Sequence, residues 1–215
     1  MDAPSTRGLR RRDAQRNREQ ILATARTLFA RDGLDVSVEE ITTQAGLGVG
    51  TLYRHFPTRD DLVEAVLEEA LQGYVDLAAQ AATDENAWTG FTTFLQQALN
   101  LHATNRGLRD ALATSDHGRA LAQATRARIR PTLTSLVERA QAEGTLRPDF
   151  RPEDVTVIFW AVARIIDAAD GTAPNLWRRY LSLLLDGLRT TAATQLPMSA
   201  PTPAQLARMA FQRAG

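Results

Sequence analysis

A short polar cluster, GLGVGTLYRHFP at residues 46–57, carries the side chains of this chain that are best suited to chemistry. Its hydroxyl, phenol, imidazole and guanidinium groups can donate hydrogen bonds to phosphate oxygens or to base edges, and its glycines permit tight turns. Three interpretations are open at this point. The cluster is a phosphate-cradling loop of an enzyme, a turn that leads into a nucleic-acid-reading helix, or an ordinary connection between helices.

The surrounding sequence argues against the enzyme. A phosphate-binding loop follows a strand and contains either a P-loop lysine or the GxGxxG spacing. Here a helical pattern precedes the cluster, the chain has no lysine, and Gly46, Gly48 and Gly50 alternate. The three histidines are isolated and the carboxylates are scattered along the chain. We therefore expect no enzyme: no catalytic residue, no metal site and no cofactor.

The segments around the cluster explain how it is positioned. Residues 16–31 carry apolar side chains at helical spacing. Ser37 and Glu40 form a capping box that starts a second, short helix, which a glycine ends. Residues 49–56 form a third helix, which Pro57 stops. Two short helices joined by a glycine-containing turn form a helix-turn-helix, whose second helix can enter the major groove of DNA.

The rest of the chain has a helical pattern too. From residue 83 onward the sequence consists of long segments rich in alanine and leucine, and no segment alternates with period two over a useful length. The chain is 44% hydrophobic and 23% charged, which is ordinary for a globular protein with a proper core. The pattern predicts an all-α fold of about nine helices in two unequal parts.

Composition also bounds the cellular context. No stretch approaches the roughly 18 to 20 consecutive apolar residues of a membrane span, and the N-terminus lacks the apolar segment of a secretory signal. We expect no membrane association. The chain has no cysteine, which excludes disulfides and thiolate sites and is compatible with a cytoplasmic location.

Charge is unevenly distributed although the formal net charge is zero. Residues 6–18 hold six arginines against the single acid Asp13. A basic arm of this kind attracts polyanions, and its binding depends on salt because each phosphate contact releases counterions. The alternative is a solvated terminus with no partner, and the arm alone does not decide between the two.

The stretch VEEITTQAGLGVGTLYRHFPTRDDLVEAV closely resembles the DNA-binding domain of the TetR family of bacterial transcriptional regulators. The resemblance covers residues of about 14 to 66, where the order G-x-x-x-G-T-L-Y-x-H-F-x-x-[KR]-x-x-L matches in spacing. From residue 83 onward only the number and lengths of the helices resemble the family. The resemblance implies an N-terminal three-helix DNA-binding domain followed by a larger helical ligand-binding and dimerisation domain.

The expected domain boundaries follow from this division. A flexible basic arm occupies residues 1–13, and the helix-turn-helix domain occupies residues 14–60. The helical effector-binding and dimerisation domain occupies residues 61–195. A proline-containing tail occupies residues 196–215.

The resemblance also implies roles for individual side chains. Thr51, Tyr53 and His55 match the family's backbone-contacting positions, with Tyr53 and His55 anchoring phosphates. Arg59 takes the place of a phosphate-contacting lysine or arginine, and Ser37 matches a capping position that can reach phosphate. The positions that match base-reading residues on the second and third helices are Glu39, Thr43, Val49, Gly50 and Arg54.

Arg54 is the strongest candidate for base recognition. A guanidinium can bond guanine O6 and N7 bidentately, for roughly 1–3 kcal/mol of discrimination. The alternatives are that Arg54 is only solvated and that Tyr53 packs against the first helix. Gly50 and Val49 offer no side-chain donor, so the basic arm is expected to supplement readout from the minor groove. The part of the arm expected there runs from Arg7 to Arg12, and its candidate DNA contacts are Arg10, Arg11 and Arg12.

Aromatic side chains cluster in the helices after residue 83. At helical spacing such residues are typical of a core, yet the resemblance implies an effector-binding domain, which contains an apolar cavity with few polar groups. We expect a small-molecule effector, apolar or aromatic, whose identity the sequence does not give. The residues predicted to line its pocket are Trp88, Phe91, Leu95, Leu99, His102, Leu121, Thr125, Arg128, Phe159, Ala163, Ile166 and Asp167.

The last two long helices are apolar over much of their circumference. A helix that is apolar on more than one face needs burial against more than its own domain. The resemblance implies a homodimer with two-fold symmetry, in which two recognition helices lie roughly 34–36 Å apart and bind a palindromic operator. The residues predicted at the dimer interface are Trp160, Arg164, Leu181, Leu184, Leu185 and Leu188.

The functional hypothesis combines these expectations. The chain is predicted to be a homodimeric, ligand-responsive repressor that binds double-stranded DNA at a palindromic operator. A small molecule in the helical core would shift the helix at 58–82, change the separation of the recognition helices and release the operator. The alternative is a ligand-independent DNA-binding regulator, or an activator in place of a repressor.

Overall fold

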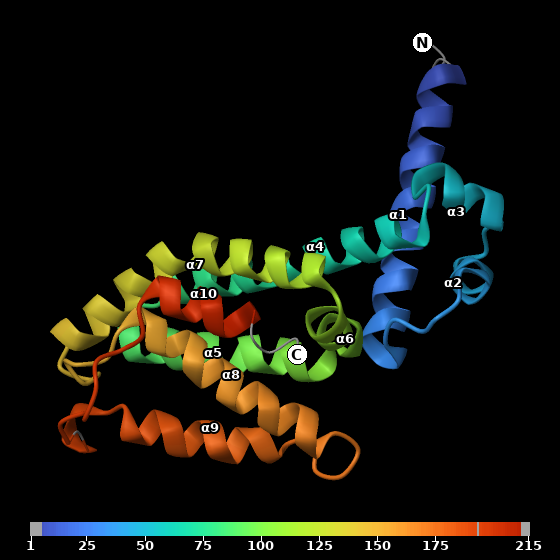
Figure 1. The fold of residues 1–215 in the computed structure, drawn as a ribbon. Coiled ribbons are helices and arrows are strands. Elements are labelled where there is room, and N and C mark those ends of the chain that lie inside the picture. The colour runs from blue at the N-terminus through green and yellow to red at the C-terminus, as the bar shows by residue number, and fades with distance from the viewer. Residues whose placement is uncertain (1–5, 193, 212–215) are drawn as a thin grey trace. The chain divides into compact units, whose positions relative to one another are not determined.

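The computed structural model describes the backbone of residues 6–192 and 194–211, and the side chains of residues 11–191 and 194–209. This part of the chain is all helical, as predicted, apart from an isolated bridge between Leu146 and Arg189. Figure 1 shows the arrangement. The helices are α1 (Thr6–Asp32), α2 (Val38–Ala45), α3 (Val49–His55), α4 (Arg59–Ala82), α5 (Ala87–Thr104), α6 (Arg106–Thr114), α7 (Asp116–Ala142), α8 (Pro152–Ala169), α9 (Leu176–Gly187), the short 3-10 helix η1 (Thr190–Ala192) and α10 (Pro203–Phe211).

Three helix boundaries differ from the sequence prediction. Most of the segment expected as a flexible arm is helical, because α1 already begins at Thr6; arginine and leucine are strong helix formers and no glycine or proline follows residue 8 before Gly33. The last long helix of the domain expected to extend to residue 195, α9, already ends at Gly187. The tail contributes a tenth helix, α10, which contacts α7 and α8.

No helix in the described ranges is long and apolar enough to cross a membrane.

Contacts group the chain into two compact units. The first contains the residues up to Ala70 together with Asn105–Ala111. The second contains Leu71–Thr104 together with the residues from Leu112 onward. Both α4 and α6 therefore contribute residues to each unit, whereas the sequence had predicted a single boundary between residues 60 and 61.

The start of α6 joins the first unit by close backbone approach. A Cβ atom at Gly107 would lie 2.9 Å from the Phe29 carbonyl oxygen, so only glycine permits this packing against α1. The carboxylate of Asp110 accepts a hydrogen bond from the backbone N–H of Leu34 at 3.1 Å. Gly33 follows the last residue of α1 and has a φ of +86°. A Cβ atom there would clash with the Asp110 carboxylate, so glycine also permits this close approach.

Each unit has its own apolar core. In the first, side chains from α1 to α4 are buried together; the most completely buried are Ile21, Leu28, Phe29, Ile41, Leu52 and Leu62. In the second, α5 packs against α7 and α8, and α8 packs against α9. Arg139 of α7 donates hydrogen bonds to the Ala82 and Asp84 carbonyl oxygens, which fixes the end of α4.

Candidate nucleic-acid interface

The turn between α2 and α3 is fixed by backbone hydrogen bonds. Ser37 adopts an extended conformation before α2, and its hydroxyl oxygen accepts the Glu40 N–H at 3.1 Å. At the other end Gly46 has a φ of 66°, the left-handed conformation that glycine tolerates best. The Leu47 N–H then donates to the Thr42 carbonyl at 3.0 Å. The geometry of the turn therefore follows from the residue types at its two ends.

Helix α3 is held against α1. The side chain of Leu52 is fully buried in the first core. Gln20 of α1 donates a hydrogen bond to the Ala45 carbonyl at the end of α2, at 2.6 Å. The Arg18 guanidinium lies 5.0 Å from the centroid of the Phe56 ring, directly after α3, which is a favourable cation–π distance. These contacts anchor both helices of the helix-turn-helix to α1.

The outer face of α3 carries the polar groups that the sequence had assigned to DNA. Tyr53 is 44% exposed and Arg54 is exposed. Thr51 and His55, four residues apart on the same helix, are half-buried. Tyr53 is therefore not packed away against α1. Gly50 precedes Tyr53 and Arg54 by three and four residues, so the three share one side of the helix. A Cβ added at Gly50 would meet no atom within 4 Å, which leaves the α3 backbone open to close approach by a duplex.

The predicted positions on α2 also point outward. Glu39 and Thr43, four residues apart, are both exposed. The Thr42 side chain, by contrast, is buried and donates to the Val38 carbonyl. Val49, at the start of α3, is half-buried against the first core. A carboxylate such as that of Glu39 accepts from cytosine N4 and repels phosphate, so a base edge is its only favourable partner on DNA.

Arg59 has a different environment from the one expected. Its guanidinium donates hydrogen bonds to the carbonyl oxygens of Leu34 and Val36, in the loop between α1 and α2. In this structure Arg59 therefore stabilises that loop, and a phosphate contact would compete with these bonds. Arg11 and Arg12 are exposed on the first turns of α1. The side chain of Arg10 lies outside the described set.

The twelve side chains predicted to line an effector pocket do not form one group. Four of them are core residues of α5: Trp88, Phe91, Leu95 and Leu99. The Phe91 ring lies edge-on to Phe150, with 5.7 Å between centroids. Thr125 is buried and donates to the carbonyl of the half-buried Leu121, whereas Arg128 is exposed and donates to Gln72. Ala163 and Ile166 of α8 are buried as well.

Three of the predicted residues do meet. The His102 ring of α5 lies 5.5 Å from the Phe159 ring of α8, and His102 Nε2 lies 4.0 Å from the Asp167 carboxylate. Tyr74 of α4 joins them, with its ring centroid 6.0 Å from that of Phe159. Sequence reasoning missed Tyr74, although its spacing from the buried Leu71 and Ala78 places it on the inner face of α4.

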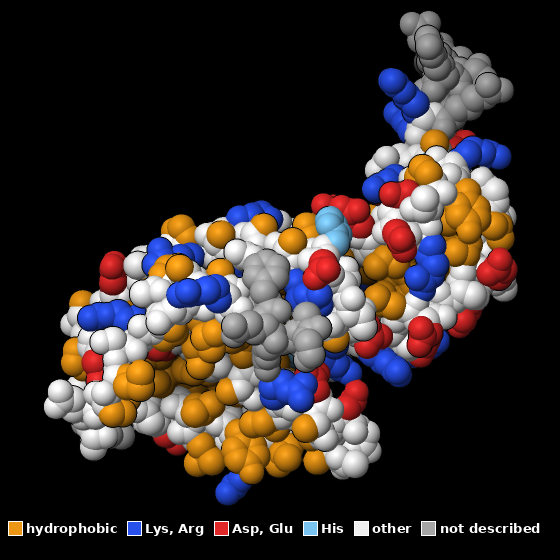
Figure 2. All heavy atoms as spheres, in the orientation of Figure 1, with side chains coloured by type: hydrophobic (Ala, Val, Ile, Leu, Met, Phe, Trp, Pro, Cys, Tyr) orange, Lys and Arg blue, Asp and Glu red, His pale blue; other side chains and the backbone are white. Residues whose placement is uncertain are grey.

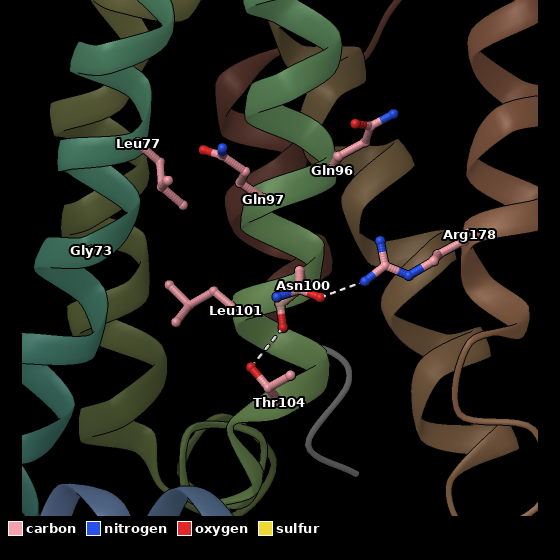
Figure 3. Close-up of a pocket in the computed structure, with 8 residues that line it drawn as sticks. All are labelled: Gly73, Leu77, Gln96, Gln97, Asn100, Leu101, Thr104 and Arg178. Carbon is pink, nitrogen blue, oxygen red and sulfur yellow. Dashed lines mark hydrogen bonds between the residues drawn. The ribbon is translucent and has the colours of Figure 1, made fainter.

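The second unit also contains an open groove of about 610 Å³ between α4, α5 and α9 (Figure 3). Its floor is polar: the Thr104 hydroxyl donates to the Asn100 carbonyl at 2.9 Å, and Arg178 donates to the Asn100 side-chain oxygen at 2.7 Å. None of the twelve predicted pocket residues lines it. The lining residues are Gly73, Leu77, Gln96, Gln97, Asn100, Leu101, Thr104 and Arg178.

The outer side of α9 carries an apolar stripe, which shares only Leu184 with the residues predicted for a dimer interface. Leu181 and Leu185 are 2% and 6% exposed and belong to the core of their own chain, so neither is available to a partner. The prediction was wrong here because the sequence could not tell which of two leucine stripes faces inward. Of the other predicted residues, Leu184 and Arg164 are exposed and Trp160 and Leu188 are half-buried.

The exposed apolar stripe of α9, called the α9 face below, consists of Leu176, Tyr180, Leu183 and Leu184, which are 39–55% exposed. Figure 2 shows hydrophobic side chains gathered along α9 at the lower edge of the view. Single exposed leucines are normal on monomers, whereas a contiguous exposed apolar patch is typical of interaction surfaces. No group of three or more metal-ligating side chains occurs within the described part of the chain.

Two family models match this chain. The model for bacterial regulatory proteins, tetR family, matches residues 21–66, and that for the transcriptional regulator SbtR-like, C-terminal domain, matches residues 85–190. Among curated proteins, an HTH-type transcriptional regulator of Staphylococcus aureus (strain USA300) is 36% identical over 75 residues. That match covers 34% of this chain and 40% of the relative, so it spans less than half of the relative's length.

Solved structures extend the likeness beyond the helix-turn-helix. The TetR transcriptional regulator SCO0520 from Streptomyces coelicolor is 31% identical, with a TM-score of 0.61, over 81% of this chain and 99% of that one. The TetR transcription regulatory protein from Mycobacterium vanbaalenii is 30% identical, with a TM-score of 0.62, over 83% and 98% of the two chains. Both matches are far longer than the first unit and include helices of the second.

Proposed function

Because the chain belongs to the TetR family of bacterial transcriptional regulators, we propose that it is a homodimeric repressor that binds a palindromic operator and releases it when a small molecule binds the second unit. Members of this family are DNA-binding transcription regulators and are generally not enzymes. The observation that carries the proposal is the outer face of α3, where exposed donor groups stand on a helix anchored from behind by a buried leucine.

The α3 face supports contact with a duplex. The phenol of Tyr53 and the guanidinium of Arg54 are exposed side by side, next to a glycine that lets the backbone approach. Arg54 would read a guanine edge, and Tyr53, Thr51 and His55 would hold phosphates. Arg11 and Arg12 would add salt-dependent affinity from the first turns of α1.

The α9 face supports the dimer. Four large apolar side chains on one helix are exposed to solvent in the single chain, and a second copy would bury them. An isologous contact of this kind brings the same patch of each subunit together and generates two-fold symmetry. Two α3 helices related by that axis would match an inverted repeat in DNA.

The connectivity of the two units supports a response to a ligand. Helices α4 and α6 each contribute residues to both units, so a change in their second-unit segments is covalently linked to the DNA-binding unit. A ligand that prefers one arrangement of these helices would shift the population toward it and change operator affinity. The alternative of a ligand-independent regulator predicts that no small molecule alters DNA binding.

The DNA-binding proposal is tested with Arg54→Ala. A labelled operator is first selected from random duplexes with the full-length protein, and affinity is then measured by fluorescence anisotropy. Loss of a bidentate guanine contact should weaken binding by roughly 5- to 150-fold, corresponding to about 1–3 kcal/mol. Arg208→Ala, an equal change at an exposed site on α10, is the matched control and should leave affinity unchanged. Equal affinity for both variants and the wild type would overturn the assignment of α3.

A further inference from the structure

The phenol oxygen of Tyr74 is a buried polar atom of the second unit, and it has no hydrogen-bond partner among the described residues. Tyr74 lies on α4 and is 8% exposed, and burial raises the pKa of its phenol well above the usual range. The group is therefore a neutral O–H donor that has lost its hydration without gaining an acceptor. Native proteins rarely leave a buried donor in this state, because a phenylalanine at the same place would be more stable.

Two other helices, α5 and α8, bring further side chains to the Tyr74 ring. Phe159 of α8 lies edge-on to both Tyr74 and His102, at 6.0 and 5.5 Å between ring centroids. His102 of α5 is buried, and its Nε2 lies 4.0 Å from the Asp167 carboxylate. Phe159 is half-buried, unlike the other two rings. Displacement of this one side chain would therefore open space beside both the Tyr74 ring and the His102 ring. Tyr74, His102 and Phe159 are called the Tyr74 cluster below.

The chemistry of the Tyr74 cluster restricts what it can bind. An O–H without an acceptor favours a ligand that supplies one, such as a carbonyl oxygen. The surrounding rings favour an apolar body, and a charged ligand would lose its hydration among them. The nearby charges of Asp167 and Arg164 lie 3.7 Å apart and balance each other, so they favour neither an anionic nor a cationic ligand. A small uncharged molecule with one carbonyl group fits all three conditions.

We propose that the Tyr74 cluster is the effector site and that its ligand is a small, uncharged carbonyl compound with an apolar body. The carbonyl oxygen accepts the Tyr74 O–H, and the apolar body takes the place of the Phe159 ring against His102. This inference rests on the proposed function, since it names the site through which the effector acts. The new hydrogen bond forms on α4, which is one of the two helices that contribute residues to both units.

The test compares two probes of nearly the same shape, acetophenone and ethylbenzene, which differ in one carbonyl oxygen. Their dissociation constants are measured by isothermal titration calorimetry with the full-length wild type and with Tyr74→Phe. The wild type should bind acetophenone about two- to tenfold more tightly than ethylbenzene, the range of one net hydrogen bond. Tyr74→Phe should bind the two probes equally. Ser135→Ala removes an exposed hydroxyl from α7, away from the Tyr74 cluster, and should keep the wild-type preference.

Folding and function are followed in the same preparations. Tyr74→Phe should melt at or above the wild-type temperature, because it removes an unsatisfied buried hydroxyl. A preference for acetophenone that survives in Tyr74→Phe would overturn the inference, and so would a wild type that binds neither probe. A wild type that fails to bind operator refutes the proposed function instead. Intact operator binding with a Tyr74-independent probe response refutes only the assignment of the Tyr74 cluster.

Discussion

Helices α3 and α9 are built in the same way yet present opposite chemistry to solvent. Each has a buried side: Leu52 in α3, and Trp177, Leu181 and Leu185 in α9. The outer side of α3 carries Tyr53 and Arg54, whereas that of α9 is a row of leucines with one tyrosine. The inner faces determine that both helices fold onto their units. The outer faces differ because one suits a hydrated polyanion and the other suits a second apolar surface.

This difference separates folding from recognition within one molecule. Substitutions on the inner faces should affect folding, and those on the outer faces should affect one partner each. We therefore expect the largest effect, a loss of folding stability, from substitutions of the buried side chains.

Leu52→Ala in α3 and Leu181→Ala in α9 should each lower the free energy of unfolding by about 2–5 kcal/mol, because both side chains are buried and leave cavities. Urea denaturation at one fixed protein concentration measures this, since dimerisation makes stability depend on concentration. A loss below about 1 kcal/mol at either site would mean that the helix does not face its core as described.

The double variant Leu183→Glu with Leu184→Glu should weaken self-association by about 100-fold or more. Apolar anchors at the centre of an interface contribute about 2 kcal/mol or more each, and the added carboxylates from two copies repel. Sedimentation velocity over a dilution series checks the dissociation constant. Leu196→Glu alters an exposed leucine in the tail, outside α9, and should leave association intact. If both variants remain dimeric, the α9 face is not the interface.

Tyr53→Phe should weaken operator binding by about tenfold and leave folding stability unchanged, since it removes one hydrogen bond to a charged phosphate from an exposed position. Anisotropy titration and urea denaturation of the same sample separate the two readouts. A loss of stability with unaltered DNA affinity would reverse the assignment and make Tyr53 a packing residue.

The smallest effect is expected at two helical glycines with open space around them. Gly50→Ala in α3 and Gly187→Ala in α9 should each stabilise the fold by up to about 1 kcal/mol, since alanine is the better helix former and no atom lies within 4 Å of the new Cβ. Only Gly50→Ala should also weaken operator binding, because its methyl group would stand between α3 and the duplex. Equal DNA affinity for both variants would argue against close approach at Gly50.

Sequence reasoning located the α3 face well because short-range signals determine it. Ser37 and Gly46 mark the ends of α2 through capping chemistry that depends only on nearby residues. With those ends fixed, the helical period places Tyr53 and Arg54 outside and Leu52 inside. Arg59 escaped this reasoning because its partners, the carbonyls of Leu34 and Val36, become neighbours only through the tertiary fold.

The second unit was harder to predict because its core and its exposed α9 face draw on the same apolar residue types. Leu181 and Leu184 are three positions apart in one helix, yet one is buried and the other exposed. The packing of α9 against α8 and α5 fixes which stripe turns inward. Tyr74 was missed for a similar reason: its lack of a partner is a property of three helices together, and no local pattern reveals it.

The most direct test of DNA recognition by a dimer is in vitro selection of duplexes from a random library, followed by the mass of the complex in solution. The account predicts enrichment of an inverted repeat whose half-sites lie about one helical turn apart, bound by two chains per duplex. Enrichment of a single unrepeated motif bound by one chain, or no enrichment at all, would contradict it.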